Sequence, residues 1–158
     1  MKYILESSSF SYLLDQFPKK VMPHIWERFE ILCSNESVVS EREVKRELEN
    51  ELNNSDSLDW VHDHLHVFKT LTQKEAEVLG QLMQKNMFSA FERSDRLNIR
   101  KLPESIPFVV ARAKHNLYTI VYREGSRNED ILKHVCRKND LKLIEVETFL
   151  QNCLKEPL

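Results

Sequence analysis

The chain has 158 residues, of which 41% are hydrophobic and 30% are charged, and its formal net charge is −2. This is the composition of an ordinary globular protein, and the length predicts a single domain over residues 1–158. No apolar run reaches the length of a membrane span, and Met1 leads into a predicted strand rather than a signal peptide. We therefore expect a cytoplasmic protein with no membrane partner.

The charge is unevenly spread along the chain. Residues 93–142 carry 12 Lys and Arg against 6 Asp and Glu, whereas residues 1–92 carry 10 against 16. A basic segment of this kind suits an anionic partner such as RNA, because phosphates are bound largely through Lys and Arg. Solvated helix faces would give the same count, and both interpretations stay open.

The first element predicted is a short buried strand. Tyr3–Leu5 is an apolar run, Glu6 follows it, and Ser7–Ser9 lead into a helical pattern over residues 10–17. A parallel strand would place Glu6 at its carboxyl end, where open α/β sheets form their ligand sites. A carboxylate beside hydroxyl groups suits a hard divalent metal, although a solvated glutamate at a strand end is the simpler alternative.

The middle of the chain is predicted to be mainly helical, with a helix over residues 21–33 and a short β-prone link over Ser37–Val39. The pairs Ser40–Glu43 and Thr72–Glu75 each have the spacing of a capping box and predict two helix starts. The first of these helices carries Glu47, one turn beyond Glu43.

The last part of the chain alternates between helices and strands. Ser105–His115 reads as a helix with Ser105 as its N-cap, followed by a strand over Tyr118–Tyr122. A helix over residues 131–138, a strand over 141–146 and a helix over 148–154 complete the pattern. This order predicts an α/β fold with a central, mostly parallel sheet and helices on both faces.

Seven stretches, in this order and spacing, resemble PIN-domain nucleases. They are KYILESSSF, FPKKVMPHIWERF, VSEREVKREL, SLDWV, SIPFVVARAK, IVYRE and HVCRKNDLKLIEVETFL. The chain is most similar to an uncharacterised PIN-like branch that is often encoded beside an antitoxin in bacteria, with VapC-like toxins as distant relatives. The resemblance implies a PIN-like three-layer fold and the lineage of metal-dependent endoribonucleases.

The resemblance also implies a site for Mg²⁺ or Mn²⁺. It assigns the catalytic and metal-binding acids to Glu6, Glu47 in KREL, and Glu124 after the predicted strand 118–122. The resemblance leaves Arg112, Arg123 and Arg127 as candidates for contacts to RNA phosphates.

Three positions depart from the family pattern. Ile106 stands where the family has an Asp directly before Pro-Phe, Glu6 replaces the first Asp, and Tyr122 replaces a strand-end Thr. An isoleucine cannot bind a metal ion, so the acidic site is degenerate.

Two functions remain open from the sequence. The chain is either a toxin–antitoxin component with weakened endoribonuclease activity, or a catalytically inactive PIN-like module that binds RNA or an antitoxin-like protein. Both are compatible with a homo-oligomer.

Overall fold

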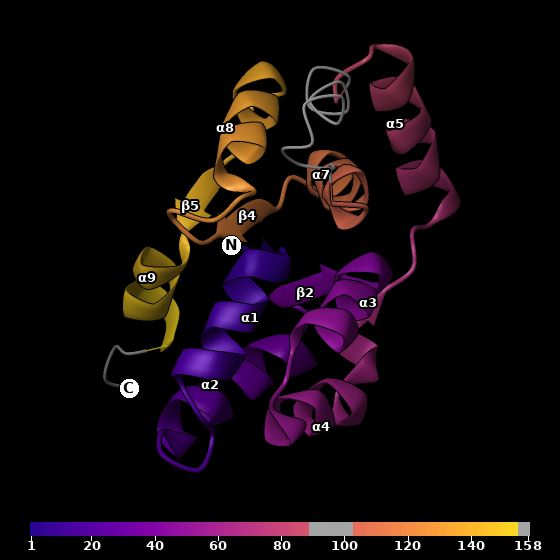
Figure 1. Ribbon diagram of the computed structural model, residues 1–158. Coiled ribbons are helices and arrows are strands. Elements are labelled where there is room, and N and C mark those ends of the chain that lie inside the picture. Colours follow the sequence, from indigo (N-terminus) through magenta and orange to yellow (C-terminus); the bar gives the residue numbers. More distant parts are fainter. Residues whose placement is uncertain (89–102, 155–158) are drawn as a thin grey trace.

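The computed structural model describes residues 1–88 and 103–154. Its described strands form one parallel sheet in the order β3-β2-β1-β4-β5. The strands are β1 (Tyr3–Leu5), β2 (Val38–Glu41), β3 (Phe68–Lys69), β4 (Thr119–Tyr122) and β5 (Leu143–Glu145). β1 therefore lies at the centre, between β2 and β4 (Figure 1), and the parallel sheet confirms the predicted fold class.

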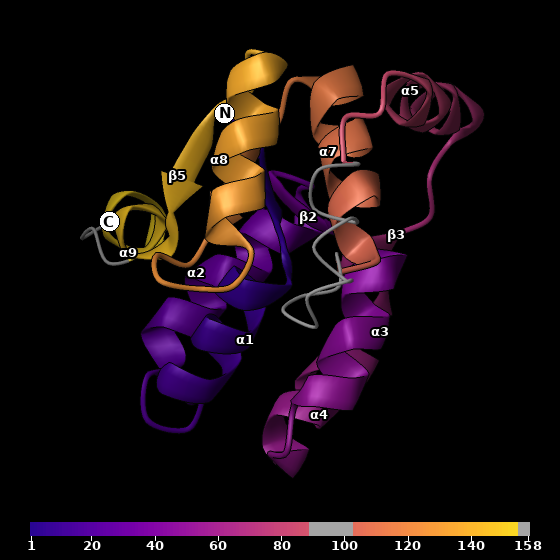
Figure 2. The ribbon, with the colours of Figure 1, turned by 45° about the horizontal axis from the view of Figure 1, so that its top comes forward.

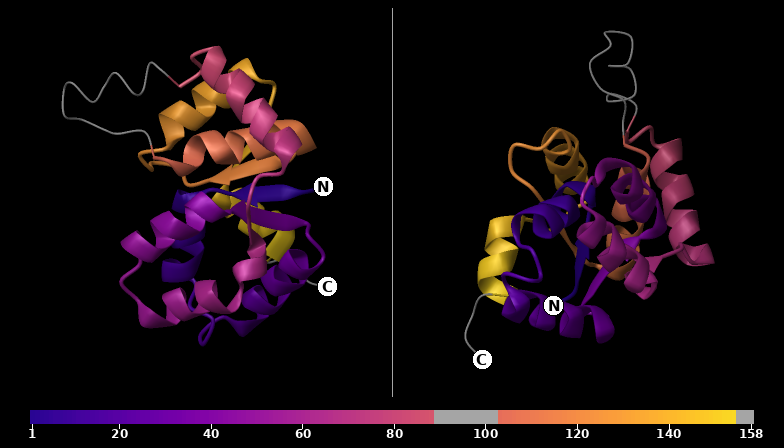
Figure 3. Two further views of the ribbon diagram at one scale, coloured as in Figure 1. Left: turned by 90° about the vertical axis from the view of Figure 1, so that its right-hand side faces the viewer. Right: turned by 60° about the horizontal axis from the view of Figure 1, so that its bottom comes forward.

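Helices cover both faces of the sheet. They are α1 (Ser7–Gln16), α2 (Pro23–Ser34), α3 (Arg42–Glu51), α4 (Ser55–Asp63), α5 (Gln73–Gln84), α7 (Ser105–Asn116), α8 (Glu129–Lys138) and α9 (Val146–Phe149), with a 3₁₀ turn at Leu65–Val67 and a π-helical turn at Leu150–Leu154. Figure 3 (left) shows α5, α7 and α8 on one side of the sheet and α1, α2 and α4 on the other. Within residues 1–88 and 103–154, no helix is long and apolar enough to cross a membrane.

The core is centred on the two middle strands. Ile4 and Leu5 of β1, and Ile120 and Val121 of β4, are completely buried. Such continuous apolar runs are typical of parallel strands, because helices cover both of their faces. The hydrophobic pattern thus indicated β1 and β4, whereas the short strand β3 was not predicted from the sequence.

The two predicted capping boxes have different outcomes. Thr72 and Glu75 form both hydrogen bonds of a capping box at the start of α5, which confirms that prediction. The prediction for Ser40 was wrong. Ser40 belongs to β2, and its hydroxyl donates a hydrogen bond to the carbonyl oxygen of Leu5 (2.7 Å). The helix α3 begins only at Arg42.

Candidate acidic site at the carboxyl edge of the sheet

Glu6 lies directly after β1 and is the N-cap of α1. Its carboxylate accepts hydrogen bonds from the backbone N–H of Ser9 (2.8 Å), from Nδ2 of Asn128 (2.7 Å) and from the hydroxyl of Ser8. The residue is completely buried. The strand, the helix start and the segment before α8 therefore meet at this one side chain.

The surroundings of Glu6 are electrically neutral. Its three hydrogen-bond donors are a hydroxyl, a backbone amide and a side-chain amide. Burial raises the pKa of Glu6, and these hydrogen bonds only partly oppose the rise. Two buried polar atoms, Oδ1 of Asn128 and Oγ of Ser126, have no hydrogen-bond partner among the described residues.

Glu47 caps a helix that is distant in the sequence. Its carboxylate accepts hydrogen bonds from the backbone N–H of Ser105 (3.2 Å) and from the Ser105 hydroxyl. Ser105 is the first residue of α7, with Glu104 as the N-cap, so the predicted N-cap lies one residue too late. Because the N-terminal end of a helix attracts negative charge, Glu47 holds α7 against α3 (Figure 2).

A salt bridge connects α3 with the segment before α8. Nη2 of Arg127 lies 3.0 Å from Oε1 of Glu51, and both side chains are exposed. Burial and the nearby charge of Glu47 raise the pKa of Glu51. Glu51 and Asn128 were not found by sequence reasoning. The spacing of Glu51, one turn beyond Glu47, was a usable signal, but nothing in the sequence pointed to Asn128.

Glu124 lies at the same edge of the sheet as Glu6 but next to β5. It follows β4, and its backbone N–H donates to Oε1 of Glu145 at 3.4 Å. Within the described residues, no group of three His, Cys, Asp or Glu side chains is arranged to hold a metal ion. The structure therefore places Glu6, Glu47 and Glu124 in three different environments: Glu6 is buried among neutral hydrogen-bond donors, Glu47 caps a helix, and Glu124 lies in an exposed turn.

The position of the missing family acid is part of the core. Ile106 is completely buried in the first turn of α7, among the hydrophobic residues of the central cluster. A carboxylate placed there would have to be buried as well, at a cost of several kcal/mol unless it were paired.

Arg112 is not placed to contact a nucleic acid, which corrects the prediction for this residue. It is buried in α7, and its guanidinium binds Glu41 (3.0 and 2.7 Å) and Glu75 (3.1 Å). A charge count along the sequence cannot distinguish such an internal cation from a surface one.

The other two arginines predicted to contact RNA are exposed. Arg123 lies over the ring of Tyr12, 4.7 Å from its centroid, and Arg127 pairs with Glu51. Contacts of Arg123 and Arg127 to RNA stay a prediction. Part of the basic segment, residues 93–101, lies outside the described residues.

The fold is that of PIN-like domains, and solved structures share it. The chain is similar to VapBC2 from Rickettsia felis, solved bound to a DNA fragment from their promoter, with 13% identity and a TM-score of 0.53. It is also similar to FitAcB from Neisseria gonorrhoeae, with 12% identity and a TM-score of 0.52. Each comparison covers 92% of this chain and 98% of the other.

A family model assigns the chain more directly. The family described as a domain of unknown function (DUF4411) matches residues 3–154, and the chain belongs to this family. No curated protein matches the sequence.

Proposed function

We propose that the protein is a PIN-like toxin–antitoxin component with a degenerate acidic site, which acts by binding an antitoxin-like protein rather than by cutting RNA. The resemblance to PIN-like proteins encoded beside antitoxins supports the protein partner. So does the likeness in fold to VapBC2, which was solved on a DNA fragment from their promoter. The buried, neutrally hydrogen-bonded carboxylate of Glu6 is the observation that argues against RNA cleavage.

Glu6 is poorly suited to hold a divalent ion. Mg²⁺ and Mn²⁺ favour ionised carboxylates and several further oxygen ligands at about 2.0–2.2 Å. Here the carboxylate is bound by three neutral donors, and burial favours its protonated form. Of the other acids that the resemblance implies, Glu47 caps α7, Glu124 lies in an exposed turn, and Ile106 stands in place of one. The residues present do not fit the ion.

One observation favours the competing function, a metal-dependent endoribonuclease. Oδ1 of Asn128 is buried next to Glu6 without a described partner, and an amide oxygen is an acceptable ligand for a hard cation. This candidate requires Glu6 to ionise and to exchange at least one of its hydrogen bonds.

A metal-binding and cleavage experiment distinguishes the two functions. Titration calorimetry with Mn²⁺ and cleavage of single-stranded RNA would compare the wild type with Glu6→Gln, and with Glu77→Gln as the matched control at an exposed acid of α5. We expect neither Mn²⁺ binding nor cleavage above the Glu6→Gln background. Wild-type cleavage that disappears in Glu6→Gln and persists in Glu77→Gln would contradict the proposal.

The protein partner is tested separately. The chain would be co-expressed with the protein encoded beside its gene and analysed by size-exclusion chromatography. We expect a stable complex. A chain that elutes alone would remove the partner-binding part of the proposal, whatever the metal experiment shows.

A further inference from the structure

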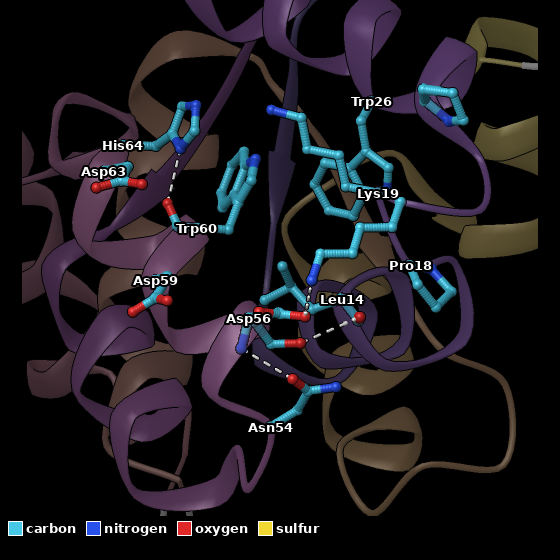
Figure 4. A pocket seen from close by; sticks show the side chains of 13 residues that line it. Leu14, Pro18, Lys19, Trp26, Asn54, Asp56, Asp59, Trp60, Asp63 and His64 are labelled. Carbon is cyan, nitrogen blue, oxygen red and sulfur yellow. Dashed lines mark hydrogen bonds and ion pairs between the residues drawn. The ribbon is translucent and has the colours of Figure 1, made fainter.

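A pocket of about 440 Å³ lies between α4 and the connection from α1 to α2 (Figure 4). Leu14 near the end of α1 lines it, whereas Glu6 caps the start of the same helix. Eight residues of helix separate the two by roughly 12 Å along the axis. The pocket is therefore distinct from the acidic site, and its size falls within the range of small-molecule sites.

Aromatic rings form one wall of the pocket. The indoles of Trp26 and Trp60 lie 5.1 Å apart between centroids, and the imidazole of His64 stacks on Trp60 at 4.1 Å with an angle of 13°. Both indoles are almost completely buried, and their N–H groups donate to the carbonyl oxygen of Phe17 and the carboxylate of Glu30. The indole N–H groups are therefore occupied within the protein, and the rings contribute apolar surface to the pocket.

Acidic side chains of α4 lie next to Trp60 and His64, across the pocket from Lys19 and Pro18 (Figure 4). Asp59 and Asp63 are exposed, line the pocket and lie one helical turn apart. The two pocket lysines already have partners, since Lys19 pairs with Glu30 (2.8 Å) and Lys20 with Asp56 (3.3 Å). Across residues 1–88 and 103–154, neither Asp59 nor Asp63 forms a salt bridge, so the pocket retains two uncompensated negative charges.

Lys19 shows which chemistry this surface accepts. The Lys19 side chain lines the pocket, and its ammonium group pairs with the carboxylate of Glu30. The same carboxylate accepts a hydrogen bond from the indole N–H of Trp60, and its Oε1 lies 3.4 Å from Nε2 of His64. An alkylammonium group thus already lies against an aromatic and acidic wall. The Lys19 side chain is 54% exposed, and an ion pair this accessible to solvent holds it only weakly.

We propose that the pocket binds a small organic cation: an ammonium group carried on an apolar, preferably aromatic, body. The body packs on the wall of Trp26 and Trp60, and the ammonium group faces Asp59 and Asp63. Aromatic faces attract cations as well as apolar groups, and nearby carboxylates select the positive charge. The proposal does not depend on the toxin–antitoxin function.

Intrinsic fluorescence can test this directly, because the chain has two tryptophans and both line the pocket. The probe is 2-phenylethylammonium, with 2-phenylethanol as a neutral analogue and phenylacetate as an anionic one. We expect a saturable fluorescence change with the cation, at least fivefold weaker binding of the alcohol, and no saturation with the anion. Calorimetry would give the stoichiometry.

Single substitutions then locate the charge selectivity. Asp59→Asn and Asp63→Asn should each weaken binding of the cation about twofold to fivefold, the range for one exposed charge contact. Glu77→Gln, at an exposed acid of α5 outside the pocket, is the control and should bind like the wild type. Lys19→Met removes the protein's own ammonium group from the pocket and should tighten binding of the cation by a similar factor.

Several results would overturn the proposal. Equal binding of 2-phenylethanol would leave only an apolar hollow. An absence of saturable signal and heat would leave no small-molecule site. Binding that Asp59→Asn, Asp63→Asn and Glu77→Gln alter equally would place the cation elsewhere. A peptide that binds here while the small cation does not would assign the surface to a protein partner instead.

Discussion

Buried carboxylates lie at the ends of two neighbouring strands, Glu6 after β1 and Glu41 at the end of β2 with Glu75 of α5 beside it, and the protein compensates these two groups differently. After β1, Glu6 is held by neutral donors alone. At the end of β2, Glu41 shares the guanidinium of Arg112 with Glu75 of α5. The second group joins β2, α5 and α7 through the guanidinium of Arg112. The charge of Glu6 has no such internal partner, so it can be neutralised only by a proton or by a bound cation. The carboxylates of Glu41 and Glu75 therefore contribute mainly to the fold through Arg112, whereas Glu6 has no internal countercharge.

The pKa directions distinguish Glu75 from the other two buried carboxylates, Glu6 and Glu41. Burial raises the pKa of Glu6 and also that of Glu41, where the bonds from Arg112 offset only part of the rise. At Glu75 burial acts in the same direction, but the Thr72 N–H, Asn116 and Arg112 outweigh it, and its pKa lies below the usual range.

The largest effect is expected when the fixed cation is removed. Arg112→Met leaves Glu41 and Glu75 buried without their cation, which should lower the free energy of unfolding by about 3–5 kcal/mol. Urea denaturation at neutral pH measures it. Arg112→Lys keeps the charge and should lose less. A loss below 1 kcal/mol for Arg112→Met would mean that the two groups do not differ in their dependence on an internal cation.

A second carboxylate beside Glu6 should convert its group into a cation-dependent one. Asn128→Asp removes a 2.7 Å hydrogen bond and adds a like charge, so we expect a loss of about 2–3 kcal/mol without metal. Mn²⁺ at ten times its Kd would then restore about 1.4 kcal/mol. Thermal unfolding with and without Mn²⁺ measures both effects. Asn128→Ala is the control, because it loses the bond without gaining a ligand. An equal response of both variants to Mn²⁺ would refute the idea.

The pH dependence should have opposite signs at Glu6 and at Glu75, because the pKa of Glu6 is raised and that of Glu75 is lowered. A raised pKa means that folded Glu6 holds its proton more tightly, so its contribution is full below the usual value of 4.5 and is lost as pH rises. Glu6→Gln should therefore lower the free energy of unfolding by about 1 kcal/mol near pH 4, and its stability relative to the wild type should increase toward pH 7. For Glu75 the pKa is lowered, so its contribution is lost as pH falls, and the cost of Glu75→Gln should shrink in acid. Parallel profiles of the two variants would contradict this difference.

The smallest effect is expected at the exposed pair between α3 and the segment before α8. Arg127→Met breaks the salt bridge to Glu51, in which the Arg127 and Glu51 side chains are 55% and 41% exposed. The free energy of unfolding should fall by less than 1 kcal/mol. The loss should decrease further at high salt, since exposed pairs are screened. Unfolding curves at two salt concentrations check it. A loss of unfolding free energy as large as that of Arg112→Met would show that solvent exposure does not determine how much the two arginines contribute to stability.

The fold was accessible from the sequence because local patterns agree with it, and the helix starts show the limit of such patterns. Ser40–Glu43 and Thr72–Glu75 have the same spacing, yet only the second forms a capping box. Thr72 begins its helix free of the sheet. The hydroxyl of Ser40 is bound instead by a carbonyl oxygen of β1, a contact across 35 residues that no local pattern contains.

The sequence indicated Glu6 as a candidate site residue, but not the side chains that bind it. Glu6 follows an apolar strand, and that position indicated the edge of the sheet. Its partner Asn128 lies 122 residues further on, and Ser105 lies 58 residues from Glu47. Side chains that meet over such separations are specified by the packing of whole helices. For the same reason, the internal position of Arg112 was not visible in a count of basic residues.

The central place of β1 has a consequence for the growing chain. Of the described strands, β1 comes first in the sequence but third across the sheet, and its pairing partner β4 begins only at Thr119. Until that strand leaves the ribosome, β1 can pair with β2 alone, and its other edge presents unpaired backbone groups. A nascent chain that has reached only residue 69 could form three strands and would still carry this open edge at Tyr3–Leu5. Completion of the sheet therefore waits for β4, and synthesis interrupted before Thr119 would release a fragment prone to strand-to-strand association through the open edge of β1.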